Sequence, residues 1–330
     1  MMQKEISKCS KNAREFMAYS FPRLRGSFMI LKNINLLKVA LIVAFATNQS
    51  FAANNVAFLN NPSPQHVKDI GNFVVKRTEK PFFSDVILFA ANINSSISNN
   101  PVLFYNDEIS SILKENISLV RNLQKKGIRV QLSYLGNHQN AGWSCNMSKA
   151  TATKLGDEMV NDVVKYGLDG INIDDEYSTC YGNRQSFYWV ADAIKSHPKF
   201  SNKVLTKALW SDYIYFKGPT NIANLLDAGY EMTYTNASVS KLAPYVNFGM
   251  KKENLLLGVS PERNSVSTVQ NITRSVINNG YSGMMVWSPN TIFTIDQASQ
   301  YYTQIIKAEE GINEEVIYVP DTAKAMQASQ

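Results

Sequence analysis

The chain of 330 residues contains 33 basic and 27 acidic side chains, which gives a formal net charge of +6 at pH 7. The positive excess lies in the first 52 residues, and residues 53–330 carry 25 basic and 25 acidic side chains. This balance gives no electrostatic reason to expect binding to nucleic acid or to an anionic membrane, so we expect a neutral partner.

Residues 1–52 have the pattern of an export leader. Lysines precede the apolar run of residues 39–46, and Ala52 ends a short polar stretch that follows it. This order predicts a signal peptide that is cleaved near Ala52, with translation starting at Met29. The run is much shorter than the roughly 20 residues of a membrane-spanning helix, so a retained anchor is the weaker alternative. We therefore expect a secreted or periplasmic protein that has no membrane attachment after cleavage.

Beyond the leader, eight short runs rich in β-branched or apolar residues alternate with amphipathic stretches. The runs are residues 56–59, 85–91, 129–135, 170–174, 203–209, 230–234, 255–259 and 283–287. The clearest helix is predicted over residues 148–166, where apolar residues recur at helical spacing and Gly167 follows as a C-terminal cap. Repeated strand and helix units predict a parallel sheet, and eight of them predict an α/β fold of the closed (β/α)8 barrel type. The alternative is an open doubly wound sheet, but no glycine-rich nucleotide-binding turn follows the first run.

The barrel is expected to form one domain, residues 53–310. No linker or break in composition interrupts this stretch, and (β/α)8 barrels commonly span ~250 residues. Residues 311–330 have no helical or strand period, and we expect them to form a loosely held tail. We expect the protein to be a monomer.

The fourth predicted strand carries the densest group of polar residues. Side chains alternate between the two faces of a strand, so Asn172, Asp174 and Glu176 are expected to point into the barrel at its carboxyl end. Burying unpaired carboxylates is expensive, which argues against a purely structural role. A solvated acidic loop would not explain the inward Asn172 and Asp174, and a Ca²⁺ site needs more oxygen ligands than this run supplies.

The run from Asp169 to Glu176, Asp-Gly-x-Asn-x-Asp-x-Glu, resembles the DGxDxDxE signature of glycoside hydrolase family 18. This family comprises chitinases and endo-β-N-acetylglucosaminidases. Residues 85–94 and 131–139, on the second and third predicted strands, resemble the endoglycosidase H type of the family. The resemblance implies that Glu176 is the general acid and then the base, and that Asp174 orients and polarises the 2-acetamido group of the substrate. It implies no cofactor.

The spacing of the two carboxylates agrees with substrate-assisted catalysis. Carboxylates two residues apart on one strand lie about 6–7 Å apart on the same side of a sugar, so they cannot flank it. Family 18 is an exception to the usual two-carboxylate mechanisms, because the acetamido group of the substrate supplies the nucleophile. Asp174, as a like charge, is also expected to raise the pKa of Glu176 and to keep this acid protonated near neutral pH.

Further candidate residues lie at or beyond the ends of predicted strands. The resemblance gives Tyr234 the role of holding the acetamido oxygen, and ordinary packing is the alternative. Trp287 is a candidate for the floor beneath the N-acetylglucosamine ring. The remaining candidates for substrate contacts are Asn172, Asn92, Asn137, Trp210 and Trp143. Each of the last two tryptophans has loop packing as its alternative.

Neither the histidines nor the cysteines have the spacing of metal ligands, so no metal is expected. Cys145 and Cys180 follow the third and fourth predicted strands, whose loops are neighbours in a barrel. Because an exported protein meets an oxidising compartment, these two residues are expected to form a disulfide. The third cysteine, Cys9, lies in the leader.

The function that the resemblance implies is hydrolysis between the two core GlcNAc residues of N-linked glycans of the high-mannose or hybrid type. A chitinase that acts on chitin-like oligosaccharides with the same residues is the first alternative. Only residues 235–254 separate Tyr234 from the seventh predicted strand, too few for the α+β insertion that family 18 chitinases often carry. An inactive GlcNAc-binding lectin is the second alternative, but such lectins typically lack the glutamate that is present here as Glu176.

Overall fold

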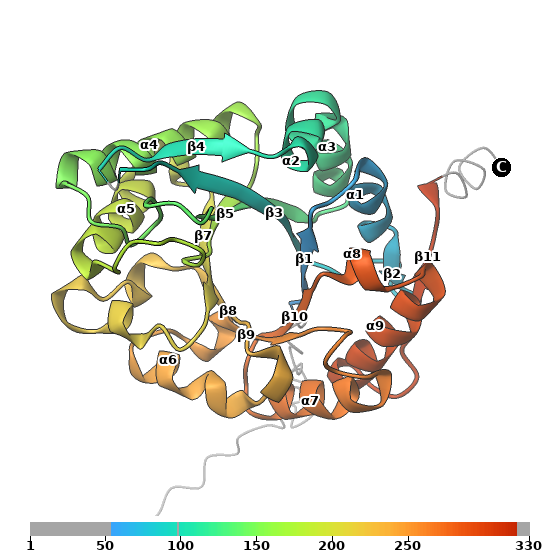
Figure 1. Ribbon diagram of the computed structural model, residues 1–330. Helices are drawn as coiled ribbons and strands as arrows, with labels where there is room; N and C mark the ends of the chain where they lie inside the picture. The colour runs from blue at the N-terminus through green and yellow to red at the C-terminus, as the bar shows by residue number, and fades with distance from the viewer. Residues whose placement is uncertain (1–53, 98, 322–330) are drawn as a thin grey trace, which may run out of the picture. The chain divides into compact units, whose positions relative to one another are not determined.

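The computed structural model describes residues 54–97 and 99–321. The predicted leader and signal peptide lie outside the described residues, and so do residues 322–330. In the described part, a ring of eight parallel strands is surrounded by helices (Figure 1). The (β/α)8 barrel that the sequence predicts is therefore confirmed.

The barrel closes because its first strand pairs in parallel with both the second and the last. Strand β1 (Val56–Asn60) lies between β3 (Asp85–Asn94) and β10 (Gly283–Trp287). The other barrel strands are β5 (Arg129–Gly136), β6 (Gly170–Ile173), β7 (Val204–Leu209), β8 (Ala228–Glu231) and β9 (Leu255–Val259). All eight predicted strands are present. Strands β6 and β8 end earlier than predicted, so the motif residues that follow them lie in loops.

Helices cover the outer face of the barrel. They are α1 (Pro64–Ile70), α2 (Asp107–Ser110), the π-helical turn η1 (Ser111–Glu115), α3 (Ile117–Lys125), α4 (Lys149–Lys165), α5 (Arg184–Ser196), α6 (Ala243–Asn247), α7 (Val266–Asn278), α8 (Pro289–Ile292) and α9 (Ile295–Glu309). Helix α4 confirms the predicted helix. It begins where the Ser148 side chain accepts a hydrogen bond from the Thr151 amide, and Gly167 follows with φ of +56°, which favours glycine. No helix of the described chain is long and apolar enough to cross a membrane.

Two layers of apolar side chains hold the barrel together. The larger layer lies between the strands and the helices, where β-branched and aromatic residues of both are buried. The smaller layer fills the barrel and consists of Val56, Phe58, Ile87, Tyr230, Leu256 and Met285. Each fully buried large side chain contributes roughly 1.5–3 kcal/mol, so the two layers supply most of the stabilisation.

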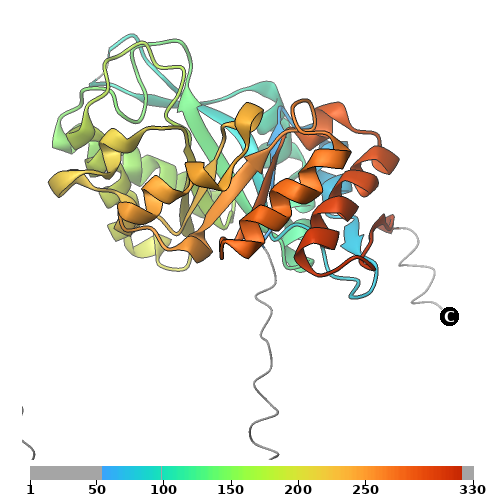
Figure 2. The same cartoon turned by 90° about the horizontal axis from the view of Figure 1, so that it is seen from below.

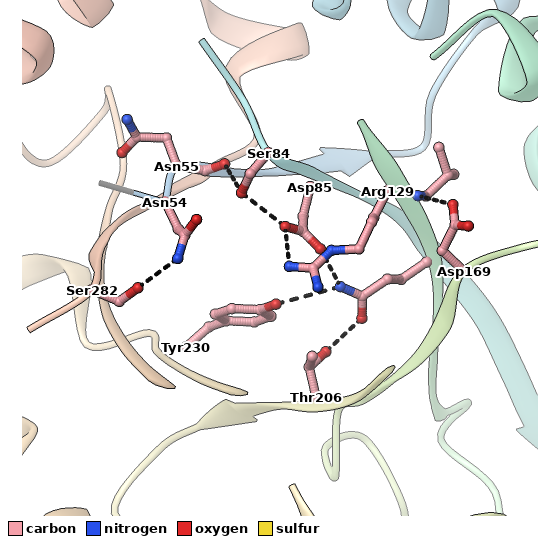
Figure 3. Close-up of polar contacts among 11 residues, drawn as sticks. Asn54, Asn55, Ser84, Asp85, Arg129, Asp169, Thr206, Tyr230 and Ser282 are labelled. Atoms are coloured by element: carbon pink, nitrogen blue, oxygen red, sulfur yellow. Dashed lines mark hydrogen bonds and ion pairs between the residues drawn. The ribbon is translucent and has the colours of Figure 1, made fainter. Parts of the chain in front are cut away.

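Polar side chains join the strands inside the amino end of the barrel (Figure 3). Arg129 and Gln131 donate hydrogen bonds of 2.8 and 2.9 Å to the two carboxylate oxygens of Asp85. The Gln131 side-chain amide also donates to the Tyr230 hydroxyl, and its oxygen accepts a hydrogen bond of 2.7 Å from Thr206. The buried Asp85 is thus paired, which offsets the cost of burying its charge.

Three short strands outside the barrel were not predicted. Strand β4 (Val102–Tyr105) pairs antiparallel with the end of β3, and β2 (Phe73–Val75) pairs antiparallel with β11 (Val316–Tyr318). The prediction that residues after 311 contain no strand is wrong for β11. This strand has only three residues, and it forms because its partner β2 lies at the other end of the described chain, where Phe73 packs against Tyr318. A local period cannot reveal such a pairing.

Candidate active site

Asp174 lies directly after β6, at the carboxyl end of the barrel. Its backbone amide donates a hydrogen bond of 3.1 Å to the carbonyl oxygen of Tyr134 on β5, which continues the strand pairing by one residue. The Asp174 side chain is 2% exposed, and its Oδ1 has no hydrogen-bond partner within the described ranges. A buried carboxylate oxygen without a partner is costly, so this atom is suited to accept a hydrogen bond from a ligand.

The backbone at Glu176 and Tyr177 is held by the last residue of β5 and by the loop that follows it. The Gly136 amide donates a hydrogen bond of 3.0 Å to the carbonyl oxygen of Glu176, and the His138 amide donates to that of Tyr177 at 2.6 Å. A Cβ atom at Gly136 would lie 2.6 Å from the Glu176 carbonyl oxygen, so the close approach requires glycine. Figure 2 shows the loops after β5 and β6 rising together above the carboxyl ends of the strands.

A disulfide joins the same two loops. Cys145 and Cys180 are bonded, as predicted, and their Cα atoms are 5.4 Å apart. A cross-link between residues 35 positions apart limits the freedom of the unfolded chain and contributes about 3–4 kcal/mol by the loop-entropy relation. The disulfide therefore restrains the segment that carries Glu176.

Aromatic side chains form a floor beside the two carboxylates. Trp287, at the end of β10, packs edge-on against Phe89 with ring centroids 4.9 Å apart, and it stacks on Tyr234 at 6.0 Å. Tyr234 begins a 3₁₀ turn after β8, and burial, followed by the charges of Asp174 and Glu176, raises its pKa, so its ring lies near both carboxylates. The structure therefore brings together four of the predicted site residues, Asp174, Glu176, Tyr234 and Trp287.

Burial governs the protonation of the two carboxyl groups. Burial, with the Glu176 charge as the next cause, raises the pKa of Asp174 to about 8. Burial also raises the pKa of Glu176, as predicted, but its like-charge neighbours are Asp175 and Asp212 rather than Asp174, and Lys207 acts in the opposite direction. The pair consequently holds at least one proton at neutral pH.

Asn172 lies beneath Asp174 and is fully buried. The Ser133 hydroxyl donates a hydrogen bond of 2.9 Å to its side-chain oxygen, and its side-chain amide donates at 3.0 Å to Thr206. The amide thus extends the polar chain of Figure 3 through Thr206. Asn172 is poorly placed to contact a substrate, because its side-chain oxygen and nitrogen are hydrogen-bonded to Ser133 and Thr206 inside the barrel.

The other predicted contact residues divide into exposed and buried ones. Asn92 is half-buried on β3 and donates to the carbonyl oxygen of Gly136, and Asn137 is half-buried on the next loop. Trp210, after β7, is 57% exposed and remains a candidate. The prediction of a sugar contact by Trp143 is wrong, because this side chain is fully buried and donates to the Tyr134 carbonyl oxygen. Burial of the ring was the alternative that the sequence left open.

Two features of the site had no predicted counterpart. Phe89 packs against Trp287 from within a ten-residue strand, and nothing in an apolar run indicates which ring makes such a contact. Lys207 is buried on β7, within the run Val-Leu-Thr-Lys-Ala-Leu. The sequence could have revealed it, because a lysine in a buried strand is expected to have a paired charge.

No group of three or more His, Cys, Asp or Glu side chains among residues 54–97 and 99–321 is arranged to hold a metal ion. The carboxylates of Asp174, Asp175 and Glu176 follow one strand, and the charge of Lys207 acts on all three. The chemistry that the site offers is proton transfer beside an aromatic floor.

Comparison with known proteins identifies relatives for most of the chain. An endo-β-N-acetylglucosaminidase of Flavobacterium sp. is 40% identical over 121 residues, which are 34% of this chain and 38% of that enzyme. The endo-β-N-acetylglucosaminidase F1 of Elizabethkingia meningoseptica is 27% identical over 75% of each chain. The match thus spans about two fifths of the first relative and three quarters of the second. No protein-family model matches the chain.

Solved structures show the same fold. EndoBT-3987 of Bacteroides thetaiotaomicron, crystallised with a Man5GlcNAc product, superposes with a TM-score of 0.62 at 20% identity, covering 83% of this chain and 64% of that one. A family 18 chitinase of Pseudoalteromonas aurantia superposes with a TM-score of 0.53 at 18% identity, covering 78% of this chain and 100% of that one.

The barrel is thus the fold that this chain shares with EndoBT-3987 and with the family 18 chitinase. In sequence, the chain is similar to these two endo-β-N-acetylglucosaminidases.

Proposed function

We propose that the protein hydrolyses the β-1,4 bond between the two core GlcNAc residues of N-linked glycans, of the high-mannose or hybrid type, by substrate-assisted retaining catalysis. The observation that carries this proposal is the placement of Asp174, Glu176 and Tyr234 around one aromatic floor. Both carboxylates follow the same strand, so they approach a bound sugar from one side, and the nucleophile comes from the substrate.

In the proposed reaction, protonated Glu176 gives its proton to the glycosidic oxygen as the bond to the anomeric carbon breaks. The carbonyl oxygen of the 2-acetamido group attacks that carbon and forms a cyclic oxazolinium intermediate. Asp174 holds the acetamido nitrogen through its unpartnered Oδ1 and stabilises the positive charge that develops there. Glu176, now a carboxylate, accepts a proton from the water that opens the ring.

Tyr234 and Trp287 are assigned to recognition of the sugar in the reacting subsite. The Tyr234 hydroxyl is proposed to donate to the acetamido carbonyl oxygen. The effect of the Asp174 and Glu176 charges on the pKa of this tyrosine, after that of burial, supports the role, because it requires the ring to lie near both carboxylates. Trp287 offers an apolar surface to the face of the sugar ring. The requirement for an acetamido group selects N-acetylhexosamine in this subsite.

The choice of N-glycans over chitin is supported by the relatives and by the loops. Both curated relatives are named endo-β-N-acetylglucosaminidases, and a second structure of EndoBT-3987 holds a Man9GlcNAc2Asn substrate. Between β8 and β9, the chain forms only short 3₁₀ turns and α6, without an added sheet domain. We propose that the protein acts as an exported monomer on glycans of glycoproteins.

Product analysis tests this proposal. The protein, without its leader, is incubated with a high-mannose glycoprotein and, separately, with chitin oligosaccharides. We expect one GlcNAc to remain on each glycosylation site and the chitin oligosaccharides to stay intact. Cleavage of chitin alone would identify a chitinase, and binding without cleavage of either substrate would identify a lectin.

A further inference from the structure

A buried lysine lies behind the strand that carries the catalytic pair. The Lys207 side chain on β7 is 2% exposed and forms an ion pair with Asp212. Its ammonium donates a hydrogen bond of 2.8 Å to the carbonyl oxygen of Ala208, and it lies 5.8 Å from the ring centroid of Phe187 on α5. Because a buried ammonium is costly without compensation, these partners mark a specific requirement for the charge.

Asp175, in the loop after β6, is the second carboxylate near Lys207. Lys207 is paired with Ile173 on β6, and Asp175 follows Ile173 by two residues, where the Lys207 charge acts on it. Asp175 accepts a hydrogen bond of 3.0 Å from Ser144, and the Lys207 charge lowers the pKa that burial raises. The Lys207 ammonium thus acts on two carboxylates, Asp175 and Asp212.

The charges of Lys207 and Asp212 also act on the catalytic pair, Asp174 and Glu176. Lys207 acts to lower the pKa values of both Asp174 and Glu176, whereas Asp212 acts to raise both. The other titratable groups that face the pair or the cluster are Asp175 on the loop after β6, Tyr177 and His138 on the two paired loops, Tyr215 after β7, Glu231 and Tyr234 at β8, and Tyr245 on α6.

We infer that Lys207 is a positioning residue that, together with Asp212, sets the charge balance around the Asp174 and Glu176 pair from behind strand β6. The inference rests on the proposed function, because it requires a reaction in which this pair exchanges protons. Lys207 touches no substrate. It acts through the carboxylates, and Asp212 opposes it.

The two charges of the ion pair predict opposite effects on the pH profile. In Lys207→Met the lost cation shifts both limbs of log(kcat/KM) to higher pH, by about half a unit to one unit. In Asp212→Asn the lost anion shifts both limbs to lower pH by a similar amount, roughly half a unit. The double variant removes both charges, so its limbs return toward those of the wild type. Lys207→Arg keeps the charge and is expected to keep the profile.

Lys195→Met is the matched control. Lys195 on α5 forms an ion pair of 2.5 Å with Asp227. Asp227 directly precedes β8, at the amino end of the barrel and away from the site. Lys195→Met therefore also removes a lysine and an ion pair, but not near the catalytic pair. Both limbs of log(kcat/KM) against pH for Lys195→Met are expected to coincide with those of the wild type. Melting curves of every variant identify any that fail to fold, and Asp212→Asn by itself still decides the sign if Lys207→Met does not fold.

Opposite shifts in the two single variants support the inference. Coincident limbs, or shifts of the same sign, overturn it, because a purely structural role gives no sign reversal. If the wild type hydrolyses no glycopeptide, the proposed function fails instead. Carboxyl ¹³C resonances of Asp174 and Glu176, titrated by NMR in the same variants, then test Lys207 without any activity.

Discussion

The amide nitrogen of Gly136 and the carbonyl oxygen of Glu176 are joined by a hydrogen bond of 3.0 Å. Strand β6 has already ended at Ile173, so the backbone of the proposed proton donor is held by the last residue of the neighbouring strand β5. The disulfide from Cys145 to Cys180 ties the same two loops together. The position of Glu176 therefore depends on contacts that lie outside the family motif.

Gly136→Ala is expected to reduce kcat/KM on a glycopeptide by about 10- to 100-fold, because a displacement near 1 Å is enough for such a loss. The added methyl group would lie 2.6 Å from the Glu176 carbonyl oxygen and would push this segment away. Gly127→Ala is the control, since φ of +85° strains an alanine there but nothing lies within 4 Å of the added group. It should lose stability and keep activity. Equal activity of Gly136→Ala and the wild type would show that the contact from Gly136 does not position Glu176.

Replacing Cys145 and Cys180 together by serine is expected to lower the free energy of unfolding by about 3–4 kcal/mol. The activity should fall at temperatures well below unfolding, because the loop that carries Glu176 gains freedom. Urea unfolding and kcat/KM at 25 °C measure the two effects. A variant as stable and as active as the wild type would remove any role for the cross-link.

Asn172→Asp is expected to remain active and to move the acidic limb of log(kcat/KM) to higher pH, by about half a unit to one unit. The new carboxylate would accept the hydrogen bond from Ser133, could no longer donate to Thr206, whose hydroxyl proton goes to Gln131, and would add a like charge beneath Asp174. The shift therefore comes from that charge, since the asparagine amide donates to Thr206 and not to Asp174. Superimposable acidic limbs from about pH 3 to 9 would mean that the charge at this position has no influence.

Asp174→Asn is expected to make the protein relatively more stable as the pH rises. Burial raises the pKa of Asp174 to about 8 in the folded protein. An acid whose folded pKa is raised contributes its full stabilisation below its unfolded pKa, near about 4, and loses it as the pH rises through the folded value. The melting temperature of the variant minus that of the wild type should thus grow by several degrees between pH 4 and 8. A constant difference across this range would contradict the raised pKa.

The strand and helix pattern predicted the fold because each barrel strand carries its own apolar run. The motif likewise predicted the buried Asp174 directly after β6, since the alternation of a strand determines which side chains enter the barrel, whereas Glu176 lies in the loop beyond the strand. Trp143 shows the limit, because an aromatic residue in a loop looks the same whether it faces a cleft or the core. Strand β11 and the hydrogen bonds of Asn172 depend on partners distant in the sequence, which local patterns do not contain.

Glu176→Gln provides the most direct test of the proposed mechanism, because an amide keeps the shape of the side chain but cannot deliver a proton. The measurement is the initial rate of glycan release from an unactivated high-mannose glycoprotein by the wild type and by the variant, with binding of the released glycan as the control for the fold. General acid–base catalysis is worth about 100- to 10,000-fold, so the variant should lose at least that lower factor while it still binds the glycan. A variant that keeps more than about a tenth of the wild-type rate would contradict the assignment of Glu176 as the general acid.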